Sequence, residues 1–278
     1  MNAESGQLPY NTKNRLIDQS DVLSLLEYGN ICIINNINIY RRAFVHKSYC
    51  TRKNENYLDG NLKCPDECMP LQEESNERLE FLGDSILNLI VASYLFERYP
   101  GVNEGFLTTM RTKLVNGKML AFLSGQINLG NFVIMSQQIE GNDGRKNKNI
   151  LEDTFEAFIA AIYLDFDQES IHHNSSGFDT AKKWVVSIIE EHVDFTELMK
   201  VNINYKDKLI KTCQHQYQFI PKFFEIDVTE RNCEREHTIC VRNNVNEIIG
   251  VGKGSSKKLA EIEASKKALT YYGFDTPA

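Results

Sequence analysis

An apolar helical pattern between Asn76 and Tyr99, with three carboxylates in its first part, constrains the fold more than any other feature of the sequence. Its apolar residues recur at intervals of three and four, which is typical of a buried helix, and a Pro-Gly pair follows it. Glu77, Glu80 and Asp84 are spaced i, i+3 and i+7, so they share one face of that helix. Like charges so arranged repel one another, so the face is either an ordinary solvated surface or a site for cations.

A second apolar helix, predicted over residues 150–166, carries another pair of carboxylates. Asp153 and Glu156 are spaced i, i+3, and the alanines around them permit close helix approach. If the two helices pack together, four acidic groups converge, and such a cluster needs cations to be stable. Carboxylate oxygens on rigid helices suit Mg²⁺ or Mn²⁺ rather than zinc.

The 278 residues suffice for about two domains. Residues 1–19 are polar and aperiodic and are predicted to be a flexible tail, with Asp21 as a plausible N-cap of the first helix. Residues 20–196 follow helical patterns, including one predicted over 107–126, and form a predicted all-α domain. Residues 197–203 are the predicted linker. Residues 204–275 combine a helix, three strands and a final helix, which predicts an α+β module.

Charge is distributed unevenly along the chain. The net charge of −7 argues against a nucleic-acid binder, because phosphate contacts need Lys and Arg. Residues 203–278, however, carry 12 Lys and Arg against 10 Asp and Glu, a net charge of +2, whereas the first 202 residues carry a net charge of −9. The two parts are therefore expected to perform different tasks.

The chain is expected to be intracellular. It has no apolar run of the roughly 18–20 residues that a membrane span needs and no apolar signal core, so no membrane contact is predicted. Seven cysteines without a regular framework indicate reduced thiols in the cytoplasm, with the nucleus left open. Cys64 and Cys68, with Cys50 and His46, could bind zinc, although their spacing favours a reduced loop.

The carboxylate helix also carries a recognisable motif. The run Asn-Glu-Arg-Leu-Glu-Phe-Leu-Gly-Asp-Ser, residues 76–85, resembles the signature of the ribonuclease III family. The segments that flank it in the family's order are Ala43–Ser48, Arg111–Val115, Gly144–Lys146 and Asp153–Ala157. The resemblance therefore covers about residues 20–275, nearly the whole chain.

The resemblance implies a role for each matched residue. Glu80, Asp84, Asp153 and Glu156 occupy the positions of metal ligands, and Asp84 and Glu156 those of the catalytic carboxylates. Glu77 matches a supporting carboxylate, or else makes a surface salt bridge with Arg78 or a partner chain. Phe81 matches an aromatic that fills a socket on the partner subunit. Arg145 and Lys146 lie in a basic loop that is expected to contact RNA.

The end of the chain resembles a double-stranded RNA-binding domain. A loop of small residues leads into a helix, and four residues are expected to bind phosphate there: Lys253, Ser255, Lys257 and Lys258. Domains of this type recognise the A-form shape of duplex RNA. Two departures put the minor-groove contacts in doubt. Ile210 and Lys211 stand where a Glu or Gln is usual, and the loop at residues 230–234 lacks the usual Gly-Pro and His, with His237 at a strand position that is usually apolar.

The resemblance implies a double-stranded-RNA-specific endoribonuclease with a helical catalytic domain, one RNA-binding domain and no small-molecule cofactor. Two metal ions, Mg²⁺ with Mn²⁺ as a substitute, would support hydrolysis to 5′-phosphate and 3′-hydroxyl ends with short 3′ overhangs. One set of carboxylates cuts one strand, so a homodimer is expected. The alternatives are a non-catalytic protein that sequesters duplex RNA and a purely structural interaction domain. Retention of all four carboxylates argues against both.

Overall fold

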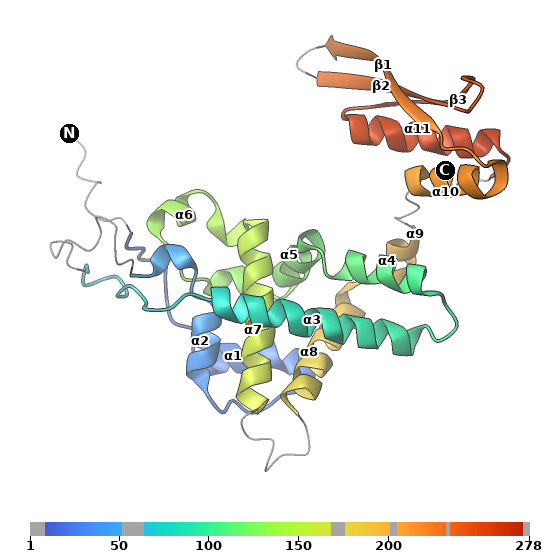
Figure 1. The fold of residues 1–278 in the computed structure, drawn as a ribbon. Helices are drawn as coiled ribbons and strands as arrows, with labels where there is room; N and C mark the ends of the chain where they lie inside the picture. Colours follow the sequence, from blue (N-terminus) through green and yellow to red (C-terminus); the bar gives the residue numbers. More distant parts are fainter. Residues whose placement is uncertain (1–8, 52–63, 168–175, 201–204, 232–233, 275–278) are drawn as a thin grey trace, which may run out of the picture. The chain divides into compact units, whose positions relative to one another are not determined.

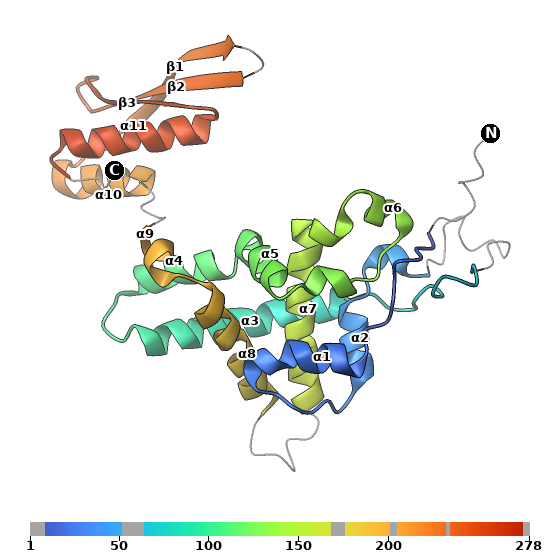
Figure 2. The same cartoon turned by 180° about the vertical axis from the view of Figure 1, so that it is seen from behind.

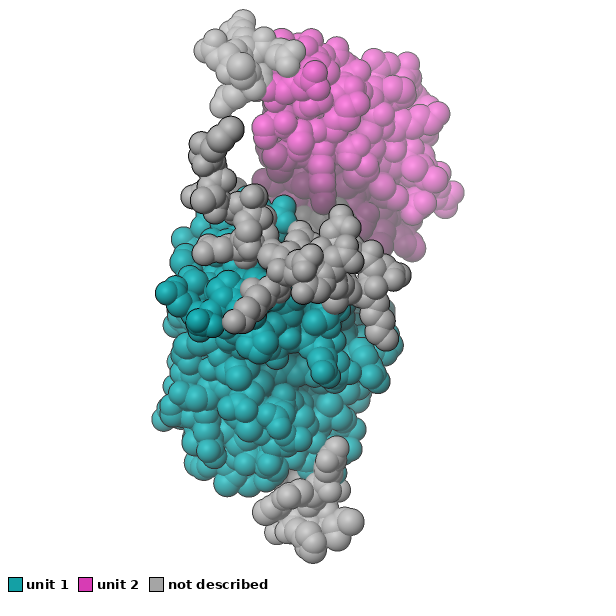
Figure 3. Space-filling view, turned by 90° about the vertical axis from the view of Figure 1, so that its left-hand side faces the viewer, with its two compact units in different colours: residues 1–198 teal, residues 199–278 magenta. Residues whose placement is uncertain are grey.

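The computed structural model describes residues 9–51, 64–167, 176–200, 205–231 and 234–274, which form two compact units, residues 1–198 and 199–278 (Figures 1 and 3). Unit 1 is helical and unit 2 contains a three-stranded sheet, so the expected fold classes are confirmed.

The described part of unit 1 consists of α-helices, short 3₁₀ turns and two isolated β-bridges. The α-helices are α1 (Gln19–Leu26), α2 (Ile37–Ala43), α3 (Glu77–Arg98), α4 (Glu104–Leu114), α5 (Gly117–Gln126), α6 (Gln137–Gly141), α7 (Lys148–Asp167), α8 (Gly177–His192) and α9 (Phe195–Lys200). The 3₁₀ turns are η1 (Glu27–Gly29), η2 (Lys47–Tyr49), η3 (Leu129–Phe132) and η4 (Gly144–Lys146).

Helix α7 is the centre of unit 1. It is apolar on nearly every side and contacts α2, α3, α5 and α8 (Figures 1 and 2). Its Phe155 and Phe158 pack on Trp184 of α8, which is fully buried and donates its indole N–H to the Leu25 carbonyl oxygen at 2.8 Å. The two predicted metal ligands of α7, Asp153 and Glu156, therefore lie on a core helix.

Helix α3 crosses α7 at a glycine. A Cβ atom on Gly83 would lie 1.8 Å from the carbonyl oxygen of Glu156, so only glycine permits this approach. By length and composition α3 could also span a membrane. Residues spaced as in a core helix are nevertheless buried in unit 1, including Leu79, Ile86 and Ile90.

Three expectations for unit 1 were wrong. Residues 9–19 are not a loose tail: Tyr10 and Ile17 are buried, and the side-chain amide of Asn14 hydrogen-bonds both the N–H and the carbonyl of Met135. The N-cap of α1 is Asp18 rather than Asp21. Asp21 is the third residue of the helix, and its side chain completes a capping box with Asp18. The helix predicted over 107–126 is two helices, since the Asn116 side chain caps α5.

The predicted linker is also partly wrong. Residues 197–200 belong to α9, whose Phe195 is buried in the core of unit 1, and the Lys113 ammonium holds the Leu198 carbonyl oxygen at 2.6 Å. The remainder of the predicted linker, residues 201–203, lies outside the described residues.

Unit 2 is an α–β–β–β–α module. It comprises α10 (Tyr205–Tyr217), the antiparallel strands β1 (Lys222–Arg231), β2 (Glu234–Arg242) and β3 (Ile248–Gly254) in that spatial order, and α11 (Lys257–Tyr271). Helix α11 packs on β2 and β3. A Cβ on Gly252 would lie 2.1 Å from the Ala264 nitrogen, so β3 and α11 are in close contact. The strand register shifts between Glu225 and Asp227, which marks a bulge in β1.

Candidate active site

The first turns of α3 carry three of the predicted carboxylates. The start of the helix is fixed by Asn76, which is buried: its backbone N–H donates to the Val45 carbonyl oxygen at 2.8 Å and its side-chain amide to the Ala43 carbonyl oxygen at 3.3 Å. Glu77 and Asp84 are exposed, whereas Glu80 is half-buried. Helix α3 therefore presents a row of carboxylates that passes from the surface to the crossing with α7.

Helix α7 supplies Asp153 and Glu156. Its beginning is fixed by Asn147, whose side-chain oxygen accepts from the Asn149 N–H at 3.0 Å. Asp153 is half-buried and Glu156 is only 7% exposed. An ionised carboxylate this deep is costly unless a cation or hydrogen-bond donors compensate its charge.

The structure brings the predicted carboxylates together. Burial, followed in order by the negative charges of Asp84, Glu152, Glu80 and Asp153, raises the pKa of Glu156 to about 8. Burial and then the Asp153 charge raise the pKa of Glu80. The pKa of Asp153 is also raised, first by its burial. Burial and mutual repulsion thus favour the protonated forms of Glu80, Asp153 and Glu156, although the Lys47 charge opposes this at Glu80 and Asp153.

Sequence reasoning missed two residues of this cluster. Glu152 is a fifth carboxylate: burial and the charges of Asp153 and Asp84 raise its pKa, and its side chain lies against Gly117 at the start of α5. Its position four residues before Glu156 was the available signal. The second residue is Lys47 of η2, which lies inside the motif that precedes the signature.

The Glu77 carboxylate is bonded by Lys47 and Ser75. The Lys47 ammonium lies 3.1 Å from Glu77 Oε1, and Ser75 donates to Glu77 Oε2 at 3.0 Å. The Lys47 hydrogen bond lowers the pKa of the Glu77 carboxyl. The salt bridge considered for Glu77 therefore exists, but with Lys47 in place of Arg78.

The donor set fits a hard divalent cation. All its ligating atoms would be carboxylate oxygens, as Mg²⁺ and Mn²⁺ prefer. Within the described ranges, no three His, Cys, Asp or Glu side chains are already drawn together as a metal would hold them, as expected for like charges with nothing between them. The same finding gives the zinc hypothesis no support. Cys64 instead contacts the carbonyl oxygens of Cys68 and Met69.

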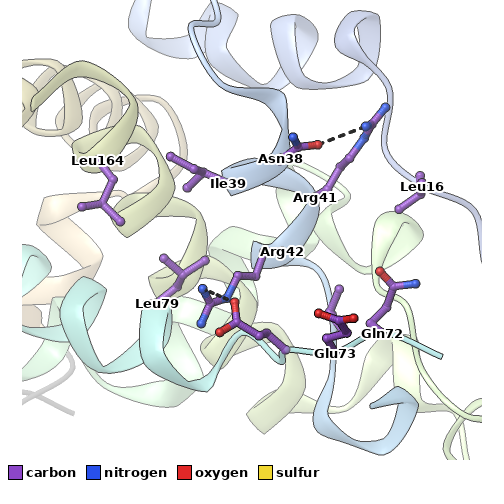
Figure 4. Close-up of a pocket in the computed structure, with 11 residues that line it drawn as sticks. Leu16, Asn38, Ile39, Arg41, Arg42, Gln72, Glu73, Leu79 and Leu164 are labelled. Atoms are coloured by element: carbon purple, nitrogen blue, oxygen red, sulfur yellow. Dashed lines mark hydrogen bonds and ion pairs between the residues drawn. The ribbon is translucent and has the colours of Figure 1, made fainter. Parts of the chain in front are cut away.

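Two pockets border this region. One of about 330 Å³ is lined by His46, Lys47, Asn149 and Asp153, among others, and so opens beside the carboxylates. The other, of about 560 Å³, lies between α2 and the segment before α3 and contains none of the clustered carboxylates (Figure 4). Its arginines are already engaged, since Arg42 pairs with Glu74 at 2.6 Å and Arg41 bonds Asn38 at 3.2 Å.

Arg145 is bonded within unit 1, and its RNA contact stays a prediction. Its side chain is turned inward, where it pairs with the buried carboxylate of Glu140 at 2.8 Å and donates to the carbonyl oxygens of Gly130 and Asn131. The guanidinium is therefore already bonded to one carboxylate and two carbonyl oxygens. Lys146 is exposed, and its RNA contact stays a prediction.

The predicted phosphate-binding residues of unit 2 lie around the start of α11. Ser256 caps the helix by accepting the Leu259 N–H at 3.3 Å. Ser255 and Lys258 are exposed, and Lys253 and Lys257 keep about two thirds of their side chains exposed. Lys211 is exposed on α10 and Ile210 is half-buried, so this helix offers no Glu or Gln at these two positions.

Comparisons with known proteins agree with both units. Residues 36–191 match the family model described as Ribonuclease-III-like, and residues 205–272 match the double-stranded RNA binding motif. The chain is 35% identical over 236 residues to Ribonuclease 3 of Borreliella burgdorferi, covering 84% of this chain and 85% of that protein.

Two further relatives differ in length from this chain. A probable ribonuclease 3 of Acanthamoeba polyphaga mimivirus is 32% identical over 266 residues, and the match spans 95% of this chain but only 47% of that protein. The solved nuclease domain of ribonuclease III from Campylobacter jejuni is 30% identical, with a TM-score of 0.48, and covers 64% of this chain and 98% of that one. From the family model and the Borreliella relative, the chain belongs to the ribonuclease III family of double-stranded-RNA-specific endoribonucleases.

Proposed function

We propose that Glu80, Asp84, Asp153 and Glu156 hold Mg²⁺, or Mn²⁺ in its place, to hydrolyse phosphodiester bonds of duplex RNA. The observation that carries this proposal is the cluster at the crossing of α3 and α7, where burial and then the surrounding negative charges raise the pKa of Glu156 to about 8. A fold that gathers uncompensated carboxylates at one rigid crossing pays a stability penalty unless cations bind there.

The residues of the cluster have different proposed roles in hydrolysis. When bound, two divalent ions lower the pKa of an attacking water and neutralise the leaving 3′ oxygen. Glu156 is the most deeply buried of these carboxylates and is affected by the charges of Asp84, Glu152, Glu80 and Asp153, so it would be the central ligand of a metal site here. Lys47 forms an ion pair with Glu77, whose charge still raises the pKa of Glu80 and of Asp153. The products would carry 5′-phosphate and 3′-hydroxyl ends.

The activity is tested with a labelled duplex RNA of about 30 bp and the purified chain. Cleavage is expected in Mg²⁺ or Mn²⁺ and not in EDTA, with ends that a 5′-phosphate-dependent exonuclease degrades. A single-stranded RNA and a DNA duplex of the same sequence serve as controls. Retention of the RNA duplex without cleavage in either metal would instead favour the sequestering protein.

We further propose that the chain acts as a homodimer through α3. Phe81 is 79% exposed, and Leu89 and Phe96 are exposed on the same face. Such a stripe on an otherwise buried helix indicates a protein partner. A second copy is the partner that suits the reaction, because two sites related by a two-fold axis can cut both strands of a duplex.

Replacing Phe81 with Ser is expected to weaken this dimer about 30-fold or more, since truncating a central aromatic typically costs about 2 kcal/mol. The measurement is analytical ultracentrifugation over a range of protein concentrations. Val245→Ser is the matched control, because Val245 is 73% exposed in the β2–β3 turn of unit 2. An unchanged association constant for Phe81→Ser would remove α3 as the interface.

The metal-free protein is expected to lose stability as pH rises from about 5 to 8. In this range folded Glu156 keeps its proton, whereas the unfolded carboxyl, with its ordinary pKa of 4.5, has released it. The unfolded state therefore binds fewer protons, and the free energy of unfolding falls with pH. Urea unfolding in EDTA, followed by fluorescence of the single Trp184, measures this slope. Glu156→Gln should flatten it, and an equal slope in that variant would contradict the assignment.

A further inference from the structure

Two lysines near the start of α11, Lys253 at the end of β3 and Lys257 of α11, are paired with acidic side chains of the sheet. Lys257 Nζ lies 2.8 Å from Glu225 Oε2, and Lys253 Nζ lies 2.9 Å from Glu236 Oε2. Lys258 has no such ion pair among the contacts of the described residues. Two of the three expected phosphate-binding cations are thus neutralised before any RNA arrives.

The two ion pairs differ in how firmly they are held. Glu225 is bonded on both carboxylate oxygens, because its Oε1 lies 2.7 Å from His237 Nδ1. Its side chain is 29% exposed and that of His237 only 14%. The hydrogen bonds from Lys257 and then His237 lower the pKa of Glu225. Glu236, in contrast, is 50% exposed and pairs with Lys253 from an exposed strand position.

The bulge in β1 accompanies this arrangement. The register shifts directly after Glu225, where Ile226 has no Cα partner on β2. His237, the residue that stands at an unusual position for an RNA-binding domain of this type, is the one that holds Glu225. The unusual His237 therefore bonds the same carboxylate, Glu225, that neutralises Lys257.

We propose that Glu225 restrains the phosphate contact of Lys257 and thereby sets the RNA affinity of unit 2. This inference rests on the proposed function, since it takes duplex RNA as the ligand. A phosphate that approaches Lys257 must compete with the Glu225 carboxylate or be repelled by it. A lysine that is already paired also releases fewer counterions, so it contributes less to the salt dependence of binding.

The test measures binding of the full chain to a 30 bp duplex RNA in EDTA, which prevents cleavage, at salt concentrations from 50 to 300 mM. Glu225→Gln is expected to tighten binding about five- to tenfold at 100 mM salt. It should also steepen the slope of log K against log salt by about 0.9, the value of one added phosphate contact. Glu247→Gln removes the same charge away from the lysines and is the control.

A double-mutant cycle with Lys257→Ala shows whether the gain passes through the lysine. Removing Lys257 should cost little in the wild type and should cancel the whole gain in the Glu225→Gln background. Thermal melting of the full chain checks that the variants fold. Glu225→Ala replaces Glu225→Gln if the latter unfolds.

The outcomes distinguish failure of the proposed Glu225 restraint from failure of the proposed RNA-binding function. If the wild type binds duplex RNA but Glu225→Gln changes neither the affinity nor the salt slope, the restraint is overturned and the proposed function stands. If Glu225→Gln gains no more than Glu247→Gln, the effect is one of net charge and the restraint is likewise overturned. If none of the variants binds duplex RNA, the RNA-binding role of unit 2 fails together with the restraint.

Discussion

Replacing Glu156 with Gln is expected to lower the rate of duplex-RNA cleavage at least about 1000-fold while RNA binding is kept. Such a loss corresponds to about 4 kcal/mol of transition-state stabilisation. The amide keeps the size of the side chain but removes the negative charge at the deepest point of the cluster. Single-turnover cleavage of the labelled duplex in Mg²⁺ measures the rate, and retention in a native gel measures binding.

Stability distinguishes loss of a ligand from damage to the fold. In the metal-free protein, burial and four neighbouring carboxylates disfavour the charged form of Glu156. Glu156→Gln is therefore expected to unfold in EDTA at the same urea concentration as the wild type or at a higher one. Mg²⁺ should raise the stability of the wild type but not that of the variant.

Glu152→Gln is the matched control, because it makes the same change four residues away on α7. Glu152 is more exposed than Glu156 and lies against Gly117, so it is not expected to be a central metal ligand. Its loss should cost about tenfold or less. A Glu156→Gln enzyme that cleaves within tenfold of the wild type, or one that no longer binds RNA, would contradict the assigned role.

Local spacing predicted much of this site. The intervals between Glu77, Glu80 and Asp84 fix their common face once α3 forms, and the apolar pattern required α3 to be buried. The sequence predicted that the carboxylates converge only if α3 and α7 pack together, because packing between helices far apart in the sequence has no local signal. The structure shows that the two helices do pack together.

Contacts across the chain explain what the sequence could not predict. Arg145 was expected to contact RNA because it lies in a basic loop, and the sequence did not show that the fold places Glu140 and two carbonyl oxygens beside it. Residues 9–19 lack a periodic pattern because they bond through single side chains, such as Asn14 to Met135, rather than through a repeating face. Lys47 pairs with Glu77 across thirty residues, a contact that no local pattern encodes.

Replacing Gly83 with Ala is expected to destabilise unit 1 by about 3 kcal/mol, the upper end of the usual cost of overpacking. The added Cβ would lie 1.8 Å from the carbonyl oxygen of Glu156 and 2.5 Å from its carbon, and both atoms belong to the backbone of a core helix. Neither helix can yield locally, because α7 is packed on α2, α5 and α8 as well as on α3. The crossing must therefore open, which moves the α3 carboxylates away from Glu156.

Gly125→Ala is the matched control. Gly125 lies in α5, and a Cβ there would meet nothing within 4 Å. Alanine should stabilise that helix by about 0.5–1 kcal/mol relative to glycine. Urea unfolding followed by Trp184 fluorescence reports on unit 1, since Trp184 is the single tryptophan and is fully buried there. Metal affinity should fall together with stability in Gly83→Ala and remain unchanged in Gly125→Ala. Equal unfolding midpoints for the two variants would mean that the glycine at the crossing is not what brings α3 and α7 together.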